Sequence, residues 1–153
     1  MLFRSGVRCV SISISDFDTH QGNFPRMRQV LPIVDHGLHA LVTDLEERGM
    51  LQNVSIVVWG EFGRTPKINA SGGRDHWPAA GPALLAGGGM KVGQVIGSTN
   101  DRGERPRDRR LHPNDVWATV YKNLGVDPQQ TFINNAGRPV PILPHGKPIA
   151  ELL

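Results

Sequence analysis

The stretch Val54-Ser-Ile-Val-Val-Trp59 is the clearest β-strand in the sequence and decides the predicted fold class. It is apolar at nearly every position, as expected of a strand that is covered on both faces in a parallel sheet. Before it, residues 27–45 repeat apolar side chains at helical spacing, and Gly49 supplies a helix stop. Earlier still, residues 6–15 alternate apolar residues with serine, the pattern of a strand. Strand, helix and strand in this order predict a βαβ unit.

The remaining segments add shorter elements around this unit. Residues 82–86 and 92–97 are apolar enough to predict two short strands, the second at a sheet edge. Residues 113–124 predict a helix, whereas Pro32 is expected to break the earlier helical region into a turn and a main helix. We therefore expect an α/β fold with a mostly parallel sheet flanked by helices.

The length of 153 residues suits one hydrophobic core, so we expect a single domain over residues 1–153. The strand at 6–15 begins almost at Met1, which predicts that this domain is partial and truncated at its N-terminal side. Missing strands would leave a sheet edge uncovered, and such an edge favours association with another chain.

Composition excludes several classes of protein. No apolar run is long enough to span a bilayer, and the N-terminus lacks a signal-peptide pattern, so the chain as written is expected to stay in the cytoplasm. Cys9, the only cysteine, rules out an intrachain disulfide and a cysteine-based zinc cluster, and its apolar setting predicts a buried thiol. The arginines of residues 102–110 interleave with acidic residues, which favours a solvated loop over nucleic-acid binding.

Three clusters of chemistry-bearing side chains follow predicted strands: Asp16-Phe-Asp-Thr-His20, Glu61-Phe-Gly-Arg64 and Arg74-Asp-His76. Parallel pairing would place the first two side by side at one sheet edge. Carboxylates and imidazoles in one cleft form an oxygen/nitrogen site for a divalent metal. The same residue types also serve as turn formers and helix caps, so both interpretations stay open. Arg64 and Arg74 carry planar guanidinium groups that match a tetrahedral oxyanion, with ion pairs to Glu61 or Asp75 as the alternative.

The motifs Phe17-Asp-Thr-His20, Val57–Pro66 and Gly73–Pro78 resemble the bacterial family called domain of unknown function 1501. That family belongs to the alkaline-phosphatase-like superfamily, alongside the sulfatases. The resemblance continues through Leu84–Gly89 to Gly146–Ile149 and so covers nearly the whole chain. It implies an alkaline-phosphatase-like fold of which this chain is the C-terminal part, in a family whose members are often exported.

The resemblance also implies one or two divalent metal ions (zinc, manganese, magnesium or calcium) at the carboxyl ends of the sheet strands. By similarity, Asp18 and His20 form the first part of the ligand set, Glu61 the second and His76 the third. Asp75 is a further partner in this metal set.

Two positions depart from the superfamily pattern. Phe62 stands where phosphatases have a histidine, which argues against a complete two-metal site. Asp16 stands where glycine is more frequent, and its spacing to His20 also resembles a phosphatase ligand pair, so Asp16 and Asp18 remain alternatives. The nucleophile of the superfamily lies N-terminal to all of these motifs, and the sulfatase pattern Cys-x-Pro-x-Arg does not occur around Cys9.

We therefore expect a metal-dependent hydrolase of phosphate or sulfate esters, or the C-terminal ligand-bearing part of one. A small anionic ester is the expected substrate, and Arg64 is the expected catalytic residue that orients its oxyanion. The alternative is a non-catalytic remnant that binds a metal or an anion, or a protein-interaction module. Because the nucleophile segment is expected to lie outside this chain, we expect the chain alone to hydrolyse such esters poorly or not at all.

Overall fold

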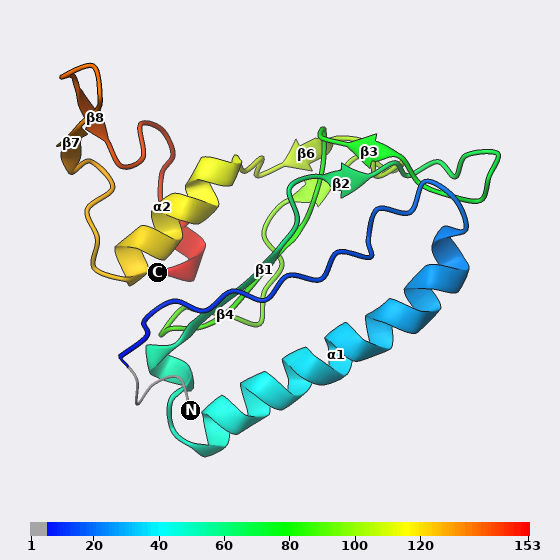
Figure 1. Ribbon diagram of the computed structural model, residues 1–153, viewed down its shortest axis with the longest axis horizontal. Helices are drawn as coiled ribbons and strands as arrows, with labels where there is room; N and C mark the ends of the chain where they lie inside the picture. Colours follow the sequence, from blue (N-terminus) through cyan, green and yellow to red (C-terminus); the bar gives the residue numbers. More distant parts are fainter. Residues whose placement is uncertain (1–5) are drawn as a thin grey trace.

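The structure, a computed structural model, describes residues 6–153 (Figure 1). Within this range the chain forms two α-helices, α1 (Asn23–Glu47) and α2 (Pro113–Asn123), and four two-stranded antiparallel sheets. The strands are β1 (Ser55–Trp59), β2 (Gly63–Arg64), β3 (His76–Trp77), β4 (Ala83–Gly87), β5 (Ser98–Thr99), β6 (Pro106–Asp108), β7 (Thr131–Ile133) and β8 (Pro139–Pro141). Two short 3₁₀ helices complete the elements, η2 (Leu51–Asn53) and η3 (Ala150–Leu152).

The predicted mostly parallel sheet flanked by helices is wrong. β1 pairs antiparallel with β4, from Ser55 opposite Gly87 to Trp59 opposite Ala83. β2 pairs with β3, β5 with β6 and β7 with β8, in each case antiparallel. An apolar run shows that a strand is covered but does not fix the direction of its neighbour. Here the chain turns back after β1, and the next apolar segment returns along the same strand.

Residues 6–15, predicted as the first strand of a βαβ unit, form a segment outside any strand. Val10, Ile12 and Ile14 are 54%, 82% and 45% exposed, and Cys9 is also exposed, so the predicted burial of its thiol is wrong. Alternation of apolar and polar residues specifies a strand only where a neighbour covers the apolar face. Within the described residues no strand pairs with this segment, and Figure 1 draws it as an irregular chain that leads into α1.

Helix α1 runs without interruption from Asn23 to Glu47 with Pro32 inside it, so the predicted break at Pro32 is wrong. An internal proline removes one backbone hydrogen bond but does not always end a helix. The predicted stop at Gly49 is confirmed, because the helix ends at Glu47 with Arg48 as its C-cap. Across residues 6–153, no helix combines the length and apolar composition that crossing a bilayer requires.

Helix α2 confirms the helix predicted over residues 113–124 and anchors the C-terminal part of the chain. His112 caps its first turn, together with Asp115, in a reciprocal capping box. Its buried face contributes Val116 to a small core with Ile149 and Leu152. Trp59 and Leu85 pack against this core and so attach β1 and β4 to it. This core holds one end of the β1–β4 pair, and the chain between the two strands carries the candidate site.

Candidate metal centre

The segment between β1 and β4 folds back on itself as the short ribbon β2–β3. Arg64 on β2 lies opposite His76 on β3, and Thr65 N donates a hydrogen bond to Asp75 O at 2.9 Å just beyond the paired strands. The Thr65 hydroxyl accepts a hydrogen bond from Asp75 N at 3.1 Å. Backbone pairing therefore holds Arg64, Asp75 and His76 within one small ribbon.

A second set of backbone contacts joins this ribbon to the segment before α1. Gln21 and Gly72 form an isolated antiparallel bridge, and Arg74 N donates to Thr19 O at 2.9 Å. Gly73 lies directly against His20, since a Cβ atom at Gly73 would be only 2.1 Å from the carbonyl carbon and oxygen of His20. A residue without a side chain is therefore required at Gly73 for the two loops to meet.

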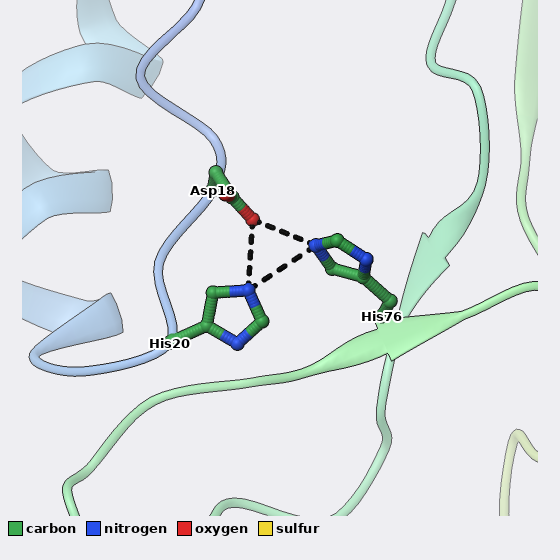
Figure 2. A group of neighbouring side chains, drawn as sticks. All are labelled: Asp18, His20 and His76. Carbon is green, nitrogen blue, oxygen red and sulfur yellow. Dashed lines mark hydrogen bonds and ion pairs between the residues drawn. The ribbon is translucent and has the colours of Figure 1, made fainter.

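These contacts bring Asp18, His20 and His76 together, as Figure 2 shows. Asp18 Oδ1 lies 3.1 Å from His20 Nε2 and 2.9 Å from His76 Nε2. The two Nε2 atoms lie 3.2 Å apart. The side chains are 60%, 48% and 48% exposed respectively, so the cluster is open to solvent. We refer to these three residues as the Asp–His–His cluster.

The spacing of the three ligand atoms fits a single divalent cation. Ligand atoms bound at about 2.0–2.2 Å to one metal lie about 2.8–3.1 Å apart in an octahedral shell and about 3.3–3.6 Å apart in a tetrahedral one. The observed separations of 2.9, 3.1 and 3.2 Å lie at or between these ranges. Three ligands on one side of a cation leave its other positions open, which is the arrangement of catalytic rather than structural metal sites.

Arg64 makes the cluster partly cationic on one side. Its Nη2 atom donates to Asp18 Oδ1 at 2.6 Å, and its side chain is only 21% exposed. Hydrogen bonds from His76 and then from Arg64 lower the pKa of the Asp18 carboxyl to about 2 from its ordinary 3.8. Asp18 is therefore a carboxylate at any physiological pH. The ion pair of Arg64 is with Asp18, and not with Glu61 as the alternative interpretation of the sequence had it.

Asp75 and Asn69 lie on the other side of His20. Asp75 Oδ1 is 2.7 Å from His20 Nδ1, and Asn69 Nδ2 donates to the Asp75 carboxylate at 3.3 and 3.4 Å. Hydrogen bonds from His20 and then from Asn69 hold the pKa of the Asp75 carboxyl below its usual value. Asn69 was not singled out from the sequence, because an asparagine in a Ser- and Gly-rich loop indicates only a turn.

The other predicted site residues are placed differently. Glu61 is exposed and is not among the three residues whose ligand atoms converge. Asp16 pairs with Arg26 at the start of α1, so Asp18 is the aspartate that lies in the Asp–His–His cluster. Phe62 packs against His76, with ring centroids 4.3 Å apart. Beside the cluster lies an open depression of about 420 Å³ whose lining includes Asp18, His20 and Arg26.

Fold and site together define a small protein of helices and antiparallel strand pairs that presents an exposed Asp–His–His cluster. The chain belongs to the family described as Protein of unknown function (DUF1501), whose family model matches residues 1–153. No curated protein and no solved structure matches the chain.

Proposed function

We propose that this protein binds a divalent metal ion through Asp18, His20 and His76 and acts in the hydrolysis of phosphate or sulfate esters. The observation that carries the proposal is the triangle of ligand atoms, with sides of 2.9, 3.1 and 3.2 Å, formed by residues from two distant parts of the chain. Two imidazole nitrogens and one carboxylate oxygen favour zinc or manganese over magnesium or calcium, which prefer all-oxygen shells. When bound, such an ion polarises a phosphoryl or sulfuryl oxygen and lowers the pKa of a bound water molecule.

Arg64 supplies the anion-binding part of the proposed site. Its guanidinium donates to Asp18 through Nη2 and lies 3.4 Å from Arg74 O through Nη1, which fixes the plane of the group beside the Asp–His–His cluster. A planar guanidinium in this place orients a tetrahedral oxyanion better than a flexible ammonium group does. Arg64 is therefore the residue that we propose positions the anionic ester.

We also propose that the chain is related to phosphatases and sulfatases, on the basis of the sequence motifs that it shares with that superfamily. In this view residues 1–153 are the C-terminal, ligand-bearing part of a domain whose nucleophile comes from a preceding segment. Hydrolysis by a covalent route would then require that segment, because the route depends on a positioned nucleophile.

The test is metal binding and turnover by the purified chain. Zinc, manganese, magnesium and calcium are titrated separately by calorimetry, and each loaded sample is assayed on an aryl phosphate and an aryl sulfate. We expect zinc or manganese to bind the wild-type chain and His39→Ala, whose histidine is exposed on α1, but not His76→Ala. Equal binding by wild type and His76→Ala would overturn the proposed site.

A second candidate function is binding of a metal or an anion without catalysis. The side chains of the Asp–His–His cluster are 48–60% exposed, whereas hydrolytic sites gain much of their electrostatic stabilisation by excluding water. Metal binding that depends on His76, without turnover by the chain or by a version extended by any upstream coding sequence, would favour this candidate.

Association through an uncovered sheet edge remains a prediction. Within the described residues β1 pairs with β4 alone, and the apolar side chains of Val10, Ile12 and Ile14 are exposed. Unpaired edges and exposed apolar residues favour contact with another chain. Sedimentation of the purified chain over a range of concentrations tests this.

A further inference from the structure

We infer that Asp75 and Asn69 are positioning residues for the Asp–His–His cluster: Asp75 holds His20 in its Nδ1-protonated form, and Asn69 holds both Asp75 and the main chain of His20. The inference deepens the proposed function, and its consequence for metal binding rests on that function. The arrangement of His20 is a property of the metal-free protein and can be tested without a metal.

The two ring nitrogens of His20 face different partners. Nδ1 lies 2.7 Å from Asp75 Oδ1, while Nε2 lies 3.1 Å from Asp18 Oδ1 and 3.2 Å from His76 Nε2. A neutral imidazole carries one N–H, and an ionised carboxylate can only accept hydrogen bonds. The contact of Nδ1 with Asp75 is the shorter one and is a hydrogen bond, whereas Asp18 Oδ1 already accepts hydrogen bonds from Arg64 and His76. We therefore assign the proton of a neutral His20 to Nδ1. The lone pair of Nε2 is then directed into the cluster, as a metal-ligating histidine requires.

Asn69 joins the loop that carries Asp75 to the main chain of His20 through one side chain. Its Nδ2 atom donates to His20 O at 2.9 Å and to the Asp75 carboxylate at 3.3 and 3.4 Å. Its Oδ1 atom accepts hydrogen bonds from Ser71 N at 3.0 Å and Gly73 N at 2.9 Å. The Oδ1 atom thus stabilises the turn of the loop that carries Asp75, and the Nδ2 atom links that loop to the main chain of His20.

Comparison with Asn134 shows which hydrogen bonds of Asn69 are specific to the site. Its Oδ1 atom accepts from Ala136 N at 2.9 Å and from Arg138 N at 3.0 Å, the same spacing of backbone donors that Asn69 uses. Asn134 lies between β7 and β8, which Figure 1 shows well apart from β2 and β3. The turn is therefore common to both residues, whereas donation to His20 and Asp75 distinguishes Asn69.

His76 is held by different means. Its ring packs on Phe62, with centroids 4.3 Å apart, and its backbone is paired with Arg64 across the ribbon. Loss of Asp75 should therefore disturb the tautomer of His20 and leave the orientation of His76 unchanged.

The experiment is ¹⁵N NMR of the metal-free, full chain with labelled histidine, at about pH 8.5, which is about two pH units above the pKa of a free imidazole. Two-bond correlations report which ring nitrogen of His20 carries the proton. We expect the Nδ1-protonated form in wild type and a shift toward the Nε2-protonated form in Asp75→Ala and Asn69→Asp. The charge-matched control is Asn134→Asp, which should leave His20 unchanged. Zinc affinity should fall about 10–100-fold in the first two variants and stay constant in the third.

The outcomes separate this inference from the proposed function. An Nε2-protonated His20 in wild type, or an unchanged tautomer in Asp75→Ala, would overturn the inference even if zinc binds. The expected tautomers without any zinc binding would support the inference and overturn the proposed function. If Asn69→Asp does not fold, Asn69→Ser replaces it, because a serine hydroxyl keeps an acceptor for the turn and removes the amide donors.

Discussion

His76 Nε2 lies 2.9 Å from Asp18 Oδ1, although the two residues are 58 positions apart in the sequence. The contact exists because the β2–β3 ribbon and the segment before α1 are joined by the Gln21–Gly72 bridge. The contact therefore depends on backbone pairing as well as on the two side chains. It can be tested by substituting either the side chains of the Asp–His–His cluster or a residue of the supporting backbone.

Substitution of the two N-terminal aspartates separates the alternatives that the sequence left open. Asp18→Asn should weaken zinc binding by more than the roughly 10–100-fold that loss of an outer partner costs, because it removes an anionic ligand. Asp16→Asn should leave zinc affinity unchanged, since Asp16 pairs with Arg26 outside the Asp–His–His cluster. Calorimetric titration of both variants checks this, and a larger loss in Asp16→Asn would mean that Asp16, and not Asp18, is the metal ligand.

The role of Glu61 in metal binding is expected to differ between the sequence resemblance and the structure. Resemblance implies that it is a metal ligand, whereas the structure leaves it exposed and outside the Asp–His–His cluster. From the structure we expect Glu61→Gln to bind zinc as wild type does. A loss of affinity comparable with that of His76→Ala would instead show that Glu61 joins the ligand set when metal binds.

Arg64→Lys keeps the charge beside Asp18 but loses the planar fork. Hydrogen bonds to charged groups contribute about 1.5–3 kcal/mol, so we expect the affinity of the zinc-loaded protein for inorganic phosphate to fall about tenfold or more. Arg28→Lys, at an exposed position on α1, is the matched control. Phosphate affinity equal in the two variants would remove Arg64 from the proposed site.

Part of this architecture could be predicted from the sequence because the signals are local. The start of α2 follows from a capping residue, a proline in the first turn and an acidic residue three positions after the cap. We expected Asp18, His20, Glu61 and His76 to converge, but from parallel strands that do not form. Of these four residues, the structure brings Asp18, His20 and His76 together through the Gln21–Gly72 bridge. Glu61 lies outside the Asp–His–His cluster, and the roles of all four residues in metal binding remain predictions.

The rest depends on contacts that no local pattern contains. The apolar run at residues 54–59 is equally compatible with a parallel or an antiparallel neighbour, so the pairing of β1 with β4 could not be read from it. The role of Asn69 depends on a hydrogen bond from its Nδ2 atom to His20 O, 49 positions away in the sequence. An asparagine in a turn gives no indication in the sequence of such a distant partner. Glycine at position 73 likewise gives no indication that it touches His20 rather than solvent.

Gly73→Ala should disrupt the contact between the two loops. The added Cβ atom would lie 2.1 Å from the His20 carbonyl group, so backbone must move, and overpacking of this kind costs about 1–3 kcal/mol. The control is Gly37→Ala within α1, where nothing lies within 4 Å and alanine should stabilise the helix by about 0.5–1 kcal/mol. Opposite shifts in urea midpoint are expected for the two variants, with zinc affinity reduced in Gly73→Ala alone.

The ion pair between Arg109 and Glu151 should make stability depend on acid pH. Arg109 Nε and Nη2 donate to Glu151 Oε1 and Oε2 at 2.6 and 2.9 Å. Chiefly because of these hydrogen bonds, the pKa of Glu151 is about 2 instead of its ordinary 4.5. The unfolded chain takes up a proton near pH 4.5 while the folded protein keeps the carboxylate ionised. The contribution of Glu151 to stability is therefore fully present above pH 4.5 and is lost as the pH falls toward 2.

Glu151→Gln should accordingly lower Tm at pH 6, by no more than about 4 °C because the pair is solvent-exposed. The difference in Tm between wild type and Glu151→Gln should shrink steadily between pH 4.5 and 2. Glu46→Gln on the exposed face of α1 serves as the control and should show no such trend. A carboxyl titration by NMR gives the direct measurement, with the pKa of Glu151 expected near 2 in wild type and near 4.5 in Arg109→Met. A Tm difference that stays constant over this pH range would mean that the ion pair does not stabilise the folded chain.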